Sequence, residues 1–137
     1  DFDLDCKSVE MAKPPTKALQ DAKSAEYIAK IKSVLDQGTP VAVEYYIGPT
    51  MATKPVRVVD VDRPTKSDAR LWLPRAPGER AYSGHGVLLV GYFTPPNGRE
   101  QFLILDSNWT EPRLFDVEDD IRRRMFSSGM IMHYCHP

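Results

Sequence analysis

The sequence predicts an α+β domain in which an antiparallel sheet, or half-barrel, is combined with one N-terminal helix and one late helix. Three observations predict this class. Apolar residues recur with helical spacing over 27–35. Two apolar runs, 86–93 and 101–105, flank a Pro-Pro-Asn-Gly turn and predict an antiparallel hairpin. Apolar residues then recur at steps of four over 117–125, which predicts a helix near the C-terminal end.

The first part of the chain predicts an arm, a helix and a strand. Residues 1–23 are polar and contain two consecutive prolines, so we expect an extended arm. Ser24 is a suitable N-cap for the following helix, and Gly38 is expected to end it. The segment 40–47 is rich in β-branched and aromatic residues and predicts a strand.

The region 48–83 has the least regular pattern. Segments 56–61 and 71–73 predict short strands, but several prolines favour irregular excursions between them. Lysines and arginines outnumber acidic residues in this region. Such a mixture is typical of a solvated surface loop, with a binding role as the alternative.

The C-terminal part predicts a strand, a helix and a closing strand. A short strand is expected at 113–115. Asp116 is expected to cap the late helix, and Gly129 is expected to stop it. The apolar segment 130–134 then predicts the last strand.

Length and composition predict one globular domain over 1–137. Hydrophobic residues make up 42% of the chain and charged residues 27%, which argues against extended disorder. A net charge of -1 argues against nucleic acid or an anionic membrane as the main partner. The longest apolar run is too short to cross a bilayer, and no signal peptide is visible. Because the chain starts at Asp1, we expect a processed protein or an excised fragment.

The chain has two cysteines, Cys6 and Cys135, one near each end. A disulfide between them would suit secretion or another oxidising compartment, and closing so long a loop would contribute about 4 kcal/mol. Two free thiols are the alternative, because separation along the sequence says nothing about distance in space.

His85 is the first candidate for chemistry. It lies between two glycines at the start of the most hydrophobic strand, so no neighbouring side chain crowds its imidazole. Asp106 ends the partner strand of the same hairpin, and a short return would bring its carboxylate beside the ring. A carboxylate bonded to one imidazole nitrogen fixes the tautomer and leaves the other nitrogen to act as a base. A surface pair with no catalytic role is the alternative.

The segment Gly84-His-Gly-Val-Leu-Leu-Val-Gly-Tyr92 resembles the strand that carries the catalytic histidine in papain-like cysteine peptidases. The preceding helix and Gly38-Thr-Pro-Val-Ala-Val43 are similar to the helix and the following strand of that family, and the resemblance covers about residues 26–109. It implies the histidine-bearing, β-rich C-terminal half of a papain-like hydrolase. The implied activity is peptide-bond hydrolysis by a thiol nucleophile, with a peptide or protein as substrate and without a cofactor.

The family's orienting residue is an asparagine in an Asn-Ser-Trp motif, and this sequence departs from that motif. Alignment on Trp109 puts Ser107 at the orienting position, whereas one inserted residue puts Asp106 there. A related branch, the secreted-effector and bacteriocin-processing peptidases, uses an aspartate in an Asp-Pro-Asn-like motif. Asp106-Ser-Asn108 is similar to that version. The resemblance therefore implies Asp106 as the orienting residue, followed by Asn108 and then by Ser107.

The nucleophile is the largest departure from the family. The family's cysteine opens a long buried helix and follows a glutamine, but no glutamine precedes Cys6, and Pro14-Pro15 would interrupt a helix that starts there. We expect Cys6 to be structural, with a nucleophilic role as the alternative. A peptidase would then need a partner chain or segment that supplies a cysteine and oxyanion donors. The rival hypothesis is a non-catalytic binding or structural module with a papain-like fold.

His133, Cys135 and His136 form a short cluster of potential metal ligands. Ligands this close on one strand end cannot converge on an ion without a tight turn, and the sequence has no second cluster. We therefore expect no metal site.

Overall fold

The computed structural model describes residues 5–11, 14–47, 56–58, 65–67, 73–81, 83–96, 98–107 and 112–136. A six-stranded antiparallel sheet has the strand order β1-β8-β2-β5-β6-β7, and β3 and β4 form a separate two-stranded sheet. The strands of the large sheet are β1 (Asp5–Met11), β8 (Met130–His136), β2 (Val41–Ile47), β5 (Ser83–Phe93), β6 (Gln101–Leu105) and β7 (Arg113–Asp116). The helices are α1 (Lys17–Asp36), a π-type helix η1 (Val117–Met125) and α2 (Phe126–Ser128), which continues η1. The predicted α+β class is confirmed.

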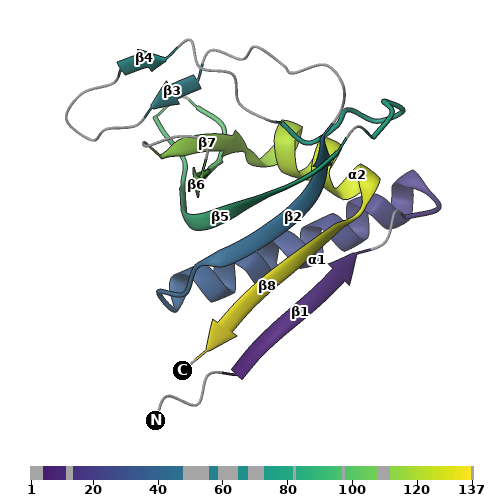
Figure 1. The fold of residues 1–137 in the computed structure, drawn as a ribbon, viewed down its shortest axis with the longest axis horizontal. Coiled ribbons are helices and arrows are strands. Elements are labelled where there is room, and N and C mark those ends of the chain that lie inside the picture. The colour runs from purple at the N-terminus through teal and green to yellow at the C-terminus, as the bar shows by residue number, and fades with distance from the viewer. Residues whose placement is uncertain are drawn as a thin grey trace.

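The N-terminal segment differs from the expected arm. β1 pairs along its whole length with β8, so the two ends of the chain lie together (Figure 1). The helix begins at Lys17, and Thr16 is its N-cap, accepting a hydrogen bond from the Leu19 amide at 3.1 Å. The prediction of Ser24 as the cap was wrong, because Ser24 is a buried residue inside α1. The first turns of α1 are mostly exposed and therefore carry no apolar periodicity that would mark their start.

The boundary between α1 and β2 agrees with the sequence. Gly38 adopts a φ of 78° just after the helix, a conformation that glycine reaches without steric cost. Side chains of β2 then alternate between the two faces of the sheet. Tyr45 points to the buried face, and its neighbours Glu44 and Tyr46 are exposed on the other.

The predicted hairpin is present as β5 and β6. β5 begins at Ser83, three residues before the predicted start, because Gly84 and Gly86 are weak strand formers that nevertheless pair with β2. Short strands β3 (Val56–Val58) and β4 (Thr65–Ser67) follow β2. The rest of the first predicted short strand, 59–61, and residues 71–72 of the second lie outside the described residues. Leu73 is buried but belongs to no strand.

The late helix also agrees with the sequence. The Asp116 side chain accepts a hydrogen bond from the Asp119 amide at 2.8 Å, as expected of an N-cap. Gly129, with a φ of 87°, ends the helical segment and leads into β8. No helix in the described part of the chain is both long and apolar enough to cross a membrane.

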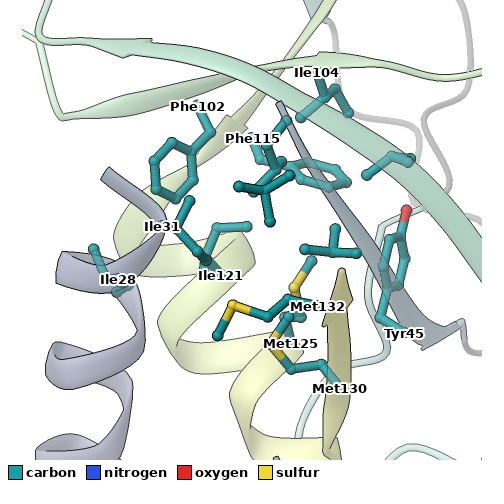
Figure 2. Close-up of a cluster of buried hydrophobic side chains, with 14 of the residues drawn as sticks. Ile28, Ile31, Tyr45, Phe102, Ile104, Phe115, Ile121, Met125, Met130 and Met132 are labelled. Atoms are coloured by element: carbon teal, nitrogen blue, oxygen red, sulfur yellow. The ribbon is translucent and has the colours of Figure 1, made fainter. Parts of the chain in front are cut away.

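The core fills the space between one face of the large sheet and the helices (Figure 2). α1 lies behind β2 and β8 in Figure 1 and contributes Ile28 and Ile31 to the core. β6 and β7 contribute Phe102 and Phe115, which are fully buried. We call the opposite side of the sheet the open face, which is the face of Ser8, Glu10, Glu44, Tyr46, Gly84, Gly86, Ile131 and His133.

Cys6 and Cys135 are directly opposite each other on β1 and β8 and are joined by a disulfide, which is the paired alternative of the sequence analysis. The bond closes the chain over a separation of 129 residues. It is compatible with an oxidising compartment.

Candidate active site

His85 and Asp106 come together as the hairpin predicts. His85 lies in β5, and Asp106 directly follows β6, the neighbouring strand. The distance from His85 Nε2 to Asp106 Oδ2 is 2.9 Å. The Asp106 side chain is 0% exposed and that of His85 is 11% exposed, so water is nearly excluded from the contact. A buried carboxylate–imidazole pair of this kind is a much stronger interaction than one in solvent.

The orientation of the imidazole ring decides what it can do. With Asp106 ionised, the Nε2–H donates to Oδ2, which sets the tautomer and leaves the basic lone pair of the ring on Nδ1. Nδ1 is therefore the nitrogen that can exchange a proton with a reacting group. The Asp106 charge also stabilises the imidazolium that forms when Nδ1 is protonated.

Tyr45, which was not among the site residues predicted from the sequence, packs against His85 from the neighbouring strand β2. It is the direct cross-strand partner of His85, and the two rings meet edge to face at 5.8 Å and 88°. Burial raises the pKa of the Tyr45 phenol well above its ordinary value, and the negative charges of Asp106 and Asp120 raise it further. Tyr45 therefore stays neutral and restrains the imidazole plane. Only the register of β2 on β5 places it there, so no local sequence signal could have revealed it.

The structure distinguishes two of the three candidates for the orienting role, Asp106 and Ser107. Asp106, not Ser107, is the residue bonded to His85, and Ser107 is exposed in the turn that follows. Asn108 lies outside the described residues, as does Trp109 of the motif.

A cavity of about 680 Å³ lies beside His85. Its lining includes the open-face residues Glu10, Glu44, Tyr46, Gly84, Gly86 and Ile131. Four strands contribute to it, β1, β8, β2 and β5, so it exists only in the assembled sheet. Its size is that of a ligand pocket.

A second histidine lies on the open face. His133 Nε2 lies 2.6 Å from Glu44 Oε2, and its Nδ1 lies 2.7 Å from the Ser8 hydroxyl oxygen, so both ring nitrogens are hydrogen-bonded. The side chains of His133 and Glu44 are 40% and 59% exposed. His133 thus bridges three neighbouring strands. Cys135, which lies in the same short cluster of potential metal ligands, is bonded to Cys6.

Cys6 cannot serve the His85 site as a nucleophile, for two reasons. Its sulfur is bonded to Cys135. Through the strand registers, His85 is level with Met11, five residues further along β1 (11 minus 6). That is about 17 Å along the strand, and the odd number places Cys6 on the opposite face.

Comparison of the chain with protein-family models, with curated proteins and with solved structures finds no match in any of the three.

Proposed function

We propose that this chain provides the general base and its orienting carboxylate in a papain-like, thiol-dependent peptidase. The observation that carries the proposal is the hydrogen bond between His85 and the fully buried Asp106, beside a cavity large enough for a substrate side chain. A histidine–carboxylate pair with a purely structural role could lie anywhere in the core. This pair lies near the strand ends, and His85 is among the residues that line the cavity, with its imidazole on the other face of the sheet from Glu44.

In the proposed reaction, His85 takes the proton of a cysteine thiol at Nδ1 and forms an imidazolium paired with Asp106. The thiolate attacks the peptide carbonyl carbon, and the imidazolium then donates its proton to the leaving amine. Water, activated by the neutral imidazole, hydrolyses the acyl-thioester and regenerates the thiol. His85 performs each of these proton transfers, and Asp106 keeps its tautomer correct throughout.

Both cysteines of this sequence are in the disulfide, so the proposed thiol belongs to a partner chain or to a segment outside these 137 residues. The same partner would provide the oxyanion donors. The chain by itself should therefore not hydrolyse peptides, because general-base help alone contributes only about 10²- to 10⁴-fold over water.

The test is a peptidase assay of the complete gene product, with and without iodoacetamide. We expect thiol-sensitive hydrolysis that falls by about 10²- to 10⁴-fold in His85→Ala. Glu118→Gln is the control, because Glu118 is exposed and pairs with Arg122 outside the cavity, so turnover should be unchanged.

Two outcomes would contradict the proposal. Activity that survives His85→Ala would show that the His85–Asp106 pair is structural. A complete gene product that folds, binds peptide and never turns it over would favour the non-catalytic binding module.

A further inference from the structure

The cavity beside His85 has an acidic lining. Glu10 and Glu44 line it, and none of its described lining residues is a lysine or arginine. Both carboxylates lie on the open face in one cross-strand row: Glu10 is level with Ile131, Ile131 with Glu44, and Glu44 with Gly86. Neighbouring strands are about 4.8 Å apart, so the backbones of the two glutamates are about 10 Å apart on either side of Ile131.

The floor of the cavity between the carboxylates is apolar or bare. Ile131 provides an aliphatic surface, and Gly86 provides backbone without a side chain. A Cβ added to Gly86 would lie 3.6 Å from the Val43 carbonyl oxygen, an ordinary contact distance, so the protein itself does not require glycine there. The space above Gly86 is open to a ligand.

Tyr46 forms a further part of the lining and is 50% exposed, which is unusual for an aromatic residue. The lining thus combines two carboxylates, an exposed aromatic ring and an aliphatic surface. This set matches a long cationic side chain, whose methylene groups pack on apolar surface while its charged end meets carboxylates and an aromatic face.

We propose that this cavity binds an arginine or lysine side chain of the peptide substrate, between Glu10 and Glu44. The link to a substrate rests on the proposed function: His85 is among the lining residues, but its imidazole lies on the other face of the sheet from Glu44, so the proposed peptide passes over the strand ends to reach both. His133 also bonds Glu44, through Oε2, but a carboxylate accepts several hydrogen bonds and can hold His133 and a guanidinium together.

The test is a binding measurement on the 137-residue chain and needs no catalysis. Nα-acetyl-arginine amide is titrated while the amide NMR signals of Gly84, Gly86 and Ile131 are followed. Nα-acetyl-citrulline amide is the neutral isostere. We expect the arginine compound to bind with a Kd on the order of millimolar and the citrulline compound to bind about tenfold more weakly.

Variants assign the binding to the two carboxylates. Glu44→Gln and Glu10→Gln should each weaken arginine binding by about three- to tenfold, and Glu44→Lys should abolish it. Glu118→Gln is the matched control: Glu118 is exposed and pairs with Arg122 outside the cavity, so its change should leave binding unchanged.

Equal binding of the arginine and citrulline compounds, or equal binding in the wild type and both glutamine variants, would overturn the cationic site. The outcome is separable from that of the proposed function. Arginine binding that depends on the two glutamates, in a complete gene product without peptidase activity, would support this site and refute the catalytic proposal. Peptidase activity without such binding would support the catalytic proposal and refute this site.

Discussion

His85–Asp106 and His133–Glu44 are two histidine–carboxylate pairs on opposite faces of one sheet. The exposed pair is the shorter, at 2.6 Å against 2.9 Å. In the buried pair, the carboxylate has no contact with solvent, whereas Glu44 is more than half exposed. Water and salt compete for the exposed pair and not for the buried one, so distance alone does not rank the two interactions. Burial makes His85 the better candidate for a held tautomer and His133 the better candidate for a surface cross-link.

The largest effect on stability is expected from removal of the disulfide. The disulfide secures β1, the strand that carries Ser8, and Ser8 is a hydrogen-bond partner of His133. Cys6→Ser with Cys135→Ser should lower the free energy of unfolding by about 4 kcal/mol, because the bond closes a very long loop. Urea denaturation measures this loss. NMR signals of His133 should change, and those of His85 should stay as in the wild type. A variant as stable as the wild type, or two free thiols in unreduced native protein by mass measurement, would contradict the expectation.

The next largest effect separates the two carboxylates. Asp106→Ala should cost about 3 kcal/mol, because it removes a charged hydrogen-bond acceptor from a buried imidazole. Glu44→Ala should cost less than about 1 kcal/mol, as is usual for exposed pairs. Asp106→Asn is the control that keeps an acceptor for Nε2–H, and it should recover much of the loss. Similar costs for both alanine variants, measured in urea, would remove the distinction drawn from burial.

Tyr45 tests the burial of the His85–Asp106 side of the sheet through the pH dependence of stability. The raised pKa of Tyr45 means that the folded state keeps the phenol proton above pH 10, while the unfolded state loses it. The stabilising contribution is complete below pH 10 and is lost as the pH rises toward the folded-state pKa, by up to about 1.4 kcal/mol per pH unit.

The measurement is the slope of unfolding free energy against pH between 9.5 and 11. Tyr45→Phe should flatten this slope relative to the wild type. Identical slopes in the two proteins would show that Tyr45 is not buried beside Asp106.

The smallest effect is expected from salt. The coupling between His133 and Glu44, measured by a double-mutant cycle to alanine, should be about 0.5 kcal/mol and should vanish in 1 M NaCl. The corresponding coupling between His85 and Asp106 should survive the same salt concentration, because the Asp106 side chain is fully buried and that of His85 is nearly so. Loss of both couplings in 1 M NaCl would indicate that His85 is exposed to solvent.

Local physics explains why much of the fold could be predicted from the sequence. Gly38, Asp116 and Gly129 mark helix ends through backbone conformation and capping, which depend on a few neighbouring residues. The β5–β6 hairpin follows from two apolar runs and a turn. Since His85 and Asp106 lie at one end of that hairpin, their contact was also predictable.

Which strands lie side by side, when they are distant in the sequence, depends on the packing of the whole sheet. β2 lies between β8 and β5, and β1 joins the edge of β8. This order puts Tyr45 against His85 and lines up Glu10, Ile131 and Glu44 across three strands. No local pattern specifies these registers, because they depend on how the whole buried face packs against the helices, and a shift of one residue would exchange the two faces. The catalytic candidate could therefore be chosen from local sequence patterns, whereas its surroundings depend on the packed sheet.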